Sequence, residues 1–238
     1  MTLKVLKPIM PDDFVLQAQT EQKLHAVLSG MINFPANGIS GLLLYGVYGT
    51  GKTTMANLLP GWIETAKTSK FLAKNPVGKL VDLNDTSFNF QACCQGQNGA
   101  SIITAIQNIT SFVSFNLSGL HFVVLDEFDL LTSAAITSLK SIMNRQDIVF
   151  IMTTNNLNKI DKAVQNRSIL LDMNAPPVHG WVSKIQGMYQ QANLTPPPAA
   201  TLNSIVAAGN GSARSILTDI EYAEVLRNKR QGSQSWTD

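Results

Sequence analysis

A glycine-rich segment that ends in a lysine and two threonines has the residue types and the spacing for binding phosphate. Residues 46–53 read GVYGTGKT, which fits the pattern G-x-x-x-x-G-K-[ST]. Glycines let the backbone curl so that its N–H groups point at an anion, and a helix that starts at the lysine adds its own unpaired donors. Lys52 can reach the terminal phosphates, and the Thr53 hydroxyl is suited to binding Mg²⁺. The residues expected to contact the nucleotide here are Gly46, Val47, Tyr48, Gly49, Thr50, Gly51, Lys52, Thr53 and Thr54.

Two carboxylates follow the apolar run 122–125. Asp126 suits a Mg²⁺ ligand, directly or through water, and Glu127 suits a base that polarises an attacking water. In an open parallel sheet the ligands lie at the carboxyl ends of the strands, which is where this pair would fall. The alternative is a charged strand end that faces solvent.

Three further polar residues could complete such a site. Asn155 follows the apolar run 147–153 and could hold the attacking water, although an asparagine after a strand commonly just makes a turn. Arg167 lies between a helical pattern and a strand pattern, and Arg214 lies early in the last helical segment. Either arginine could be an ordinary surface charge, or it could stabilise the charge that phosphoryl transfer builds.

The elements that must position these residues alternate between strands and helices. Such alternation predicts an α/β fold in which helices cover both faces of a parallel sheet. From residue 175 onward only helical patterns occur, so we expect an α/β nucleotide-binding domain over 1–174, a helical lid over 175–231 and a disordered tail over 232–238. A polar loop is expected over 91–99. The expected strands are 42–45, 79–83, 122–125, 147–153 and 168–172, and the expected helices include 52–59, 100–115, 132–144, 178–192, 202–208 and 212–230.

The composition argues against several classes of protein. No apolar run in the 238 residues approaches the length of a membrane span, and the first residues lack a secretory signal. The net charge of +2 does not by itself indicate a nucleic-acid binder. The two cysteines are adjacent, so they offer neither a disulfide framework nor a zinc site. We expect a cytoplasmic protein, in the host cytoplasm if the gene belongs to a phage.

Taken together, these segments resemble AAA+ ATPases, and among them the ATPase subunits of sliding-clamp loaders: the small subunits of replication factor C and their phage counterparts. GVYGTGKTT is similar to the family's Walker A motif, and VVLDEFDLLT is similar to its Walker B motif, with Asp126, Glu127 and Asp129 in the corresponding places. TTNNLNKIDKAVQNRS keeps the family's spacing from a sensor asparagine, Asn155, to an arginine, Arg167. GSARSILTDIE is similar to the helix that carries the lid arginine. The opening segment 7–28 and the segment 80–88 also resemble the family.

The resemblance to this family implies a fold, ligands, partners and a role for each candidate residue. The fold would be a five-stranded parallel sheet followed by a small helical lid, and the protein would be a Mg²⁺-dependent ATPase with ATP and Mg²⁺ as its ligands. The backbone around Phe14 and Val15 would face the adenine. Arg167 would reach the nucleotide of the next subunit, and Arg214 would pull the lid onto the phosphates. The catalytic set would be Lys52, Glu127, Asn155, Arg167 and Arg214, with Thr53 and Asp126 holding the metal. The partners would be other AAA+ subunits in a homo- or hetero-oligomer, a sliding clamp and primer–template DNA, with no membrane.

The sequence also departs from the clamp-loader pattern. Ser-Arg-Cys is replaced by Asn166-Arg167-Ser168, and Ser212 stands where the family usually has an aspartate before the lid arginine. The segment 100–115 carries no Lys or Arg, and no helical collar domain follows the lid in this sequence. Lys140 and Arg145 are the candidate DNA contacts, with a solvated helix face as the alternative. Two other functions stay open: a helicase loader, initiator or branch-migration motor, and an ATP-binding structural subunit with little turnover.

Overall fold

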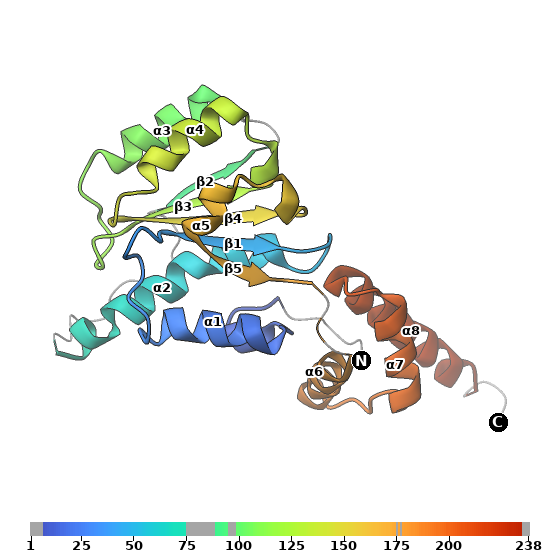
Figure 1. The fold of residues 1–238 in the computed structure, drawn as a ribbon. Helices are drawn as coiled ribbons and strands as arrows, with labels where there is room; N and C mark the ends of the chain where they lie inside the picture. The colour runs from blue at the N-terminus through green and yellow to red at the C-terminus, as the bar shows by residue number, and fades with distance from the viewer. Residues whose placement is uncertain (1–6, 75–88, 95–98, 175, 177, 235–238) are drawn as a thin grey trace. The chain divides into compact units, whose positions relative to one another are not determined.

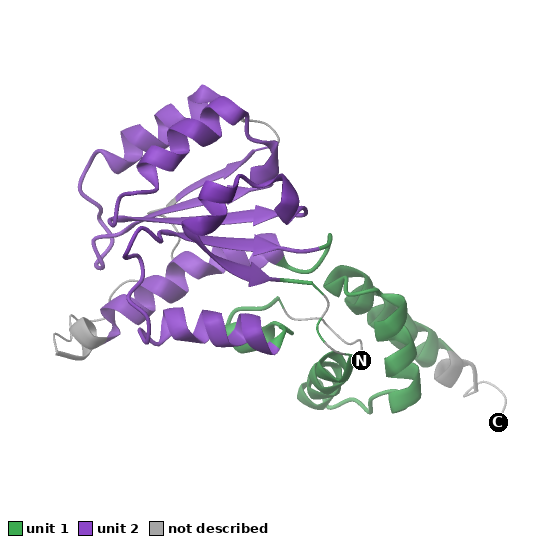
Figure 2. Cartoon of the chain, viewed as in Figure 1, with its two compact units in different colours: residues 1–17, 47–51, 173–238 green, residues 18–46, 52–172 purple. Residues whose placement is uncertain are grey.

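The computed structural model describes residues 7–74, 89–94, 99–174, 176 and 178–234. The chain divides into two compact units (Figure 2). We call them the sheet unit, Ala18–Gly46 with Lys52–Asp172, and the helical unit, which combines Met1–Gln17, Val47–Gly51 and Met173–Asp238. The domain bounds expected from the sequence stay a prediction.

The sheet unit is built on five parallel strands in the order β2-β3-β4-β1-β5 (Figure 1). This confirms the predicted α/β fold with a five-stranded parallel sheet. Every residue of β4 is buried, and so are the first residues of β1 and β3, because these strands lie inside the sheet with helices on both faces. The strands are β1 Gly41–Tyr45, β2 Asn89–Cys93, β3 His121–Asp126, β4 Ile148–Thr154 and β5 Ser168–Asp172.

Strand β2 corrects one expectation. It lies partly within the segment 91–99, which was predicted as a polar loop, and that prediction is wrong. Of the described strands only β3 pairs with β2, and Phe90 and Ala92 pack on the core while Gln91 and Cys93 are exposed. An edge strand with one buried face alternates in polarity, so it lacks the continuous apolar run by which the inner strands were recognised. The strand expected at 79–83 lies outside the described residues.

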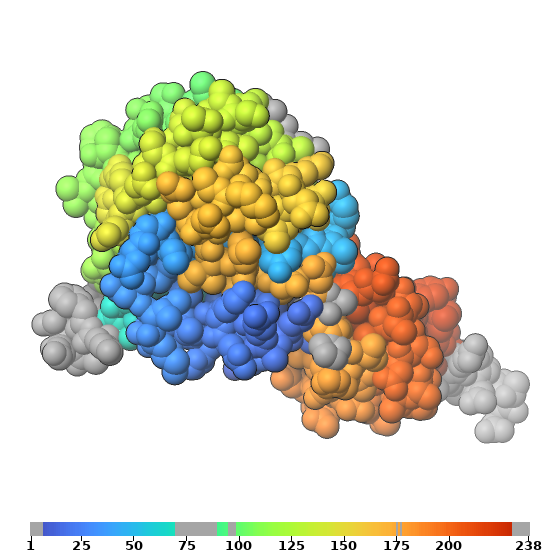
Figure 3. Space-filling view, in the orientation of Figure 1, coloured from blue at the N-terminus to red at the C-terminus, as the bar shows by residue number. Residues whose placement is uncertain are grey.

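Helices cover both faces of the sheet. Figure 1 shows α3 and α4 on one side of it and α1 and α2 on the other. On the face of the sheet unit that Figure 3 shows, the surrounding helices and loops cover most of the sheet. Ile102, Leu139 and Val164 are among the fully buried residues that pack beneath α3, α4 and α5. The helices of this unit are α1 Ala18–Leu28, α2 Lys52–Lys74, α3 Ala100–Thr110, α4 Ser133–Ile142 and α5 Lys162–Asn166.

Two helix ends also differ from expectation. Helix α2 continues through Pro60 to Lys74 instead of stopping near Leu59. Leu59, Trp62 and Ile63 are all buried, and this packing on both sides of the proline outweighs the hydrogen bond that a proline removes. Helix α3 ends at Thr110 rather than Phe115.

The helical unit has its own core. Helices α6 Val178–Gln191, α7 Ala199–Ala208 and α8 Ala213–Gln234 match the three helical segments predicted after residue 175. Helix α8 runs into the stretch expected as a tail, and residues 235–238 lie outside the described part. Among the described helices, none combines the length and the apolarity that crossing a bilayer requires. The buried residues of this core are Trp181, Ile185, Tyr189, Leu202, Val206, Ile216 and Ile220.

Candidate nucleotide-binding site

The glycine-rich loop follows β1 and leads into α2. Gly49 and Gly51 have φ angles of +78° and +93°, a region that L side chains rarely adopt. A Cβ atom on Gly49 would lie 2.4 Å from the Ser212 hydroxyl, and one on Gly51 would lie 3.4 Å from the Phe14 ring. The loop therefore needs glycine at both positions, as a backbone that curls around an anion does.

Lys52 is the first residue of α2 and only 7% exposed. Its ammonium group donates a 2.9 Å hydrogen bond to the carbonyl oxygen of Gly46. Burial lowers the pKa of Lys52, while the nearby carboxylates of Asp126 and Asp129 act in the opposite direction. A buried ammonium group at the start of a helix is suited to pairing with phosphate oxygens. Thr54, two residues further along α2, is exposed.

Thr53 and Asp126 lie together where α2 begins and β3 ends. The Thr53 hydroxyl lies 3.0 Å and 3.1 Å from the two carboxylate oxygens of Asp126. A hydroxyl beside a carboxylate is the oxygen donor set that Mg²⁺ prefers, so these residues fit the metal predicted here.

Glu127 follows Asp126 in a left-handed conformation, with φ +54° and ψ +46°. Its backbone N–H donates to the hydroxyl of Thr153, 3.0 Å away, and that hydroxyl in turn donates to the Asp126 carboxylate. The thiol of Cys93 at the end of β2 lies 3.7 Å from a carboxylate oxygen of Glu127. The two acids are thus held by residues from the neighbouring strands β4 and β2.

The polar end of β4 carries the remaining sequence-predicted residue on this edge. Thr154 donates a 2.8 Å hydrogen bond to Asp129, and its own backbone oxygen accepts one from Gly46. Asn155 follows directly and is half-buried. Parallel strands end at one edge, so Asn155, Asp126 and the start of the glycine-rich loop share that edge of the sheet.

Within the helical unit, other predicted residues meet the loop 47–51. The backbone N–H of Arg214 donates to the Gly49 carbonyl at 3.0 Å, and the side chain of Arg214 is exposed. The N–H of Val47 donates to the Asn174 side chain at 3.0 Å. Phe14 faces Gly51, and Val15 packs against the core of this unit. Tyr48 is 75% exposed and Thr50 donates back to the Val47 carbonyl.

Among the predicted residues of the sheet unit, Arg167 does not lie at this edge. It precedes β5, whose first residue pairs with Gly41, the first residue of β1. The glycine-rich loop follows the other end of β1, roughly 13 Å away at about 3.3 Å per residue. The guanidinium group donates to the Asn144 side chain at 3.1 Å and to the Ala163 carbonyl at 3.0 Å.

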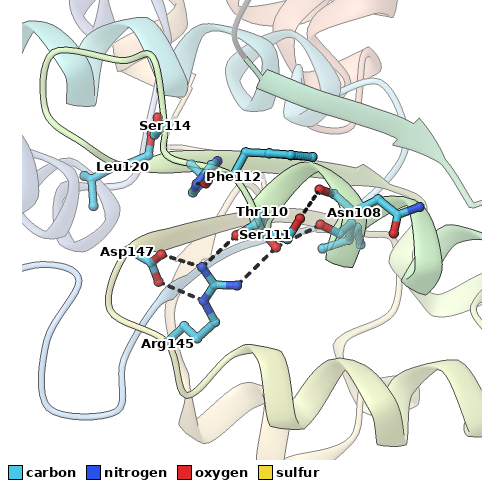
Figure 4. Close-up of polar contacts among 10 residues, drawn as sticks. Asn108, Thr110, Ser111, Phe112, Ser114, Leu120, Arg145 and Asp147 are labelled. Atoms are coloured by element: carbon cyan, nitrogen blue, oxygen red, sulfur yellow. Dashed lines mark hydrogen bonds and ion pairs between the residues drawn. The ribbon is translucent and has the colours of Figure 1, made fainter.

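The two candidate DNA contacts are engaged within the chain. Arg145 forms a two-pronged ion pair with Asp147 and donates to the carbonyl of Thr110 at 2.8 Å, which ties the end of α3 to the start of β4 (Figure 4). Lys140 pairs with Asp161 at 3.1 Å. Both cations therefore have partners within the chain, a structural role that was not among the two expectations from the sequence.

Sequence reasoning missed two side chains of the site. Thr153 was predicted as the last residue of the strand 147–153, and Cys93 was placed in a loop. The repeated threonines before Asn155 were a signal, but the sequence could not show which hydroxyl meets the acidic pair. That choice follows from the register, in which Leu125 lies opposite Met152.

A protein family and a relative of known function match the sequence of this chain. A model of AAA, the ATPase family associated with various cellular activities, matches residues 42–171. Replication factor C small subunit 2 from Pyrobaculum islandicum is 25% identical over 204 residues, which cover 84% of this chain and 58% of that protein. The chain thus spans less than two thirds of the length of this relative.

Solved structures share the fold. RuvB from Thermotoga maritima, a Holliday junction branch migration motor, superposes with a TM-score of 0.62 at 17% identity, covering 89% of this chain and 63% of that chain. C. elegans PCH-2 gives a TM-score of 0.53 at 17% identity, covering 87% and 62%. At this level of identity the likeness shows the fold alone.

Proposed function

The chain belongs to the AAA family of ATPases, and we propose that it is a Mg²⁺-dependent ATPase of the clamp-loader type in DNA replication. The observation that carries the proposal is the contact of Thr53 with Asp126 directly after the glycine-rich loop. It joins the end of the phosphate-binding pattern to the acidic pair at one edge of the sheet. The similarity to a replication factor C small subunit supports the clamp-loader type.

Each residue of the proposed site has a distinct task. The backbone of 47–51 and the Lys52 ammonium group bind the phosphates, and Thr53 with Asp126 holds the metal. A bound Mg²⁺ would offset the negative charge of the phosphates. Glu127 accepts a proton from the attacking water, and Asn155 orients that water.

Arg167 would act on the nucleotide of a neighbouring subunit. Its position at the opposite ends of the strands separates it from Lys52, Thr53 and Asp126 of its own chain. AAA proteins typically act as oligomers, so a neighbour can present its Arg167 at the site. A guanidinium group there stabilises charge in the transition state, worth about 10³–10⁵ in rate in known cases.

Arg214 would report the state of the nucleotide. The hydrogen bond from its N–H to Gly49 ties the start of α8 to the glycine-rich loop. An arginine that bonds a γ-phosphate only before hydrolysis biases a helical lid between two positions. This is how the proposed ATPase would convert hydrolysis into movement.

A protein client is supported by the loop that joins α3 to β3. Phe112, Val113 and Phe115 are 72%, 88% and 84% exposed, and the segment 108–120 carries no charged residue. Two hydrogen bonds from Ser118 to the buried carboxylate of Glu64 anchor this loop to α2. Exposed apolar side chains on an anchored loop are suited to contacting another protein. We propose that this surface contacts another protein, and within the proposed clamp-loader function the candidate is the sliding clamp.

The test of the proposed function is steady-state ATP hydrolysis over a range of protein concentrations, with and without primed-template DNA. A rate per chain that rises with concentration and again with DNA supports an assembling replication ATPase. A rate that depends on neither contradicts the replication role. A second assay adds a sliding clamp: the clamp should raise the rate of the unchanged chain, and the double change Phe112→Ser and Phe115→Ser should remove this rise while leaving the basal rate unchanged. Equal stimulation of both proteins would contradict the assignment of this surface.

A further inference from the structure

One hydroxyl group contacts both acidic residues of the site. The Thr153 oxygen accepts a hydrogen bond from the Glu127 N–H at 3.0 Å and donates its own hydrogen to Asp126. Thr153 is 2% exposed, so water does not replace these bonds readily.

The first of these bonds fixes an unfavourable backbone. Glu127 has φ +54°, which costs a non-glycine residue energy that the surroundings must supply. Its backbone N–H donates to the Thr153 hydroxyl, on the neighbouring strand β4. The bond therefore holds the turn that aims the Glu127 side chain.

The second bond fixes the carboxylate of Asp126. Thr53 approaches this carboxylate from α2, and Thr153 approaches it from β4. Two hydroxyls on two elements leave the carboxylate little freedom to rotate, and rotation would move the oxygen that is proposed to hold the metal.

We propose that Thr153 is a positioning residue that sets the geometry of Asp126 and Glu127 together. The inference rests on the proposed ATPase function. A side chain of the same shape without the hydroxyl would free both acids at once, because a single oxygen serves both.

Thr154 provides a matched control. It is the next residue of the same strand, it is fully buried, and its hydroxyl also bonds an aspartate, Asp129, at 2.8 Å. Both threonines lose one buried hydroxyl when changed to valine, but only Thr153 contacts the acidic pair.

The experiment compares Thr153→Val, Thr153→Ser and Thr154→Val in the full chain. The measurements are kcat, KM for ATP, thermal unfolding, and the affinity for a fluorescent ATP analogue with Mg²⁺ and with EDTA. For Thr153→Val we expect kcat to fall about 10- to 100-fold, the scale of losing hydrogen bonds to charged groups. We also expect the gain in analogue affinity on adding Mg²⁺ to shrink, while the affinity in EDTA stays unchanged. Thr153→Ser should restore both quantities, and Thr154→Val, which leaves the bonds to Asp126 and Glu127 in place, should change both much less than Thr153→Val does.

Three outcomes would overturn the inference: an unchanged kcat in Thr153→Val, an equal loss in Thr154→Val, or no recovery in Thr153→Ser. If Thr153→Val does not fold, Thr153→Ala removes the same hydroxyl without adding bulk and takes its place. Failure of the proposed function has a different signature, because the wild-type chain itself would then bind or hydrolyse no ATP.

Discussion

The backbone N–H of Arg214 donates a 3.0 Å hydrogen bond to the carbonyl oxygen of Gly49. The first turn of α8 is therefore attached to the middle of the glycine-rich loop. Ser212, just before that helix, accepts a hydrogen bond from the Ser215 N–H and so caps the helix start. A change in this loop should therefore alter the start of α8 as well as nucleotide binding.

Gly49→Ala tests this attachment. The new Cβ would lie 2.4 Å from the Ser212 hydroxyl at a φ of +78°, so the loop or the helix cap must move. We expect the affinity for ATP to fall at least about tenfold, equivalent to roughly 1.4 kcal/mol. Isothermal titration with the nucleotide measures it.

The matched control is Gly30→Ala. Gly30 has a similar φ of +73°, but no atom lies within 4 Å of its added Cβ. This variant should lose about 1–2 kcal/mol of stability from backbone strain and keep its affinity for ATP. Equal affinities in the two variants would show that the clash with Ser212 is unimportant.

Lys52→Ala should abolish nucleotide binding. The change removes the buried ammonium group at the start of α2, which is proposed to bind the terminal phosphates. Lys67→Ala, an exposed lysine on the same helix, is the control and should bind ATP normally. Tight binding of ATP by Lys52→Ala would refute the assignment of the phosphate-binding loop.

The two adjacent cysteines should differ sharply in reactivity. Cys93 is exposed, whereas Cys94 is buried, and burial raises the pKa of the Cys94 thiol to about 12. Because the thiolate is the reactive form, Cys94 stays protonated and unreactive from about pH 7 to about pH 9. Maleimide labelling followed by mass spectrometry should find one modified thiol in the folded chain and two in denaturant.

Labelling should also slow ATP hydrolysis, because the Cys93 thiol lies 3.7 Å from the Glu127 carboxylate and an attached group would displace it. Cys93→Ser, treated in the same way, is the control. Full activity of the labelled wild-type chain would mean that Glu127 is not the base or does not stay beside Cys93.

Arg145→Ala should weaken the fold rather than contact with DNA. Arg145 pairs with Asp147 and donates to the Thr110 carbonyl, and these groups are partly exposed. We expect a loss of about 1 kcal/mol in the free energy of unfolding, smaller in about 1 M salt, which screens the ion pair. Denaturant titration measures this loss, with Lys159→Ala as an exposed-cation control. Unchanged stability together with weaker DNA binding would restore Arg145 as a DNA contact.

The sequence predicted the inner strands and the helical unit because burial there leaves continuous or periodic apolar patterns. Strands β1, β3 and β4 were recognised in this way. Strand β2 was not predicted, because an edge strand exposes every second residue and so lacks a continuous apolar run. Gln91 and Cys93 are the exposed residues here. Pro60 was read as a helix end because local propensity does not show the packing of Trp62 and Ile63.

Only part of the site could be predicted from the sequence. Lys52, Thr53, Asp126 and Glu127 belong to short contiguous motifs, so their proximity could be inferred from the ends of neighbouring strands. The bridge from Thr153 to both acids depends on the register of β3 against β4, which residue types do not specify. The position of Arg167 at the opposite strand ends likewise follows from topology.

In the proposed mechanism a complete site needs Glu127 from one chain and Arg167 from a neighbour. Subunit mixing tests this sharing, with Glu127→Gln and Arg167→Ala each expected to have lost most hydrolysis while still binding ATP. Mixed in equal amounts and allowed to exchange, they should recover activity, because about one interface in four would then pair an intact Glu127 with an intact Arg167. A mixture that assembles but stays as inactive as its parts would contradict a site shared between subunits.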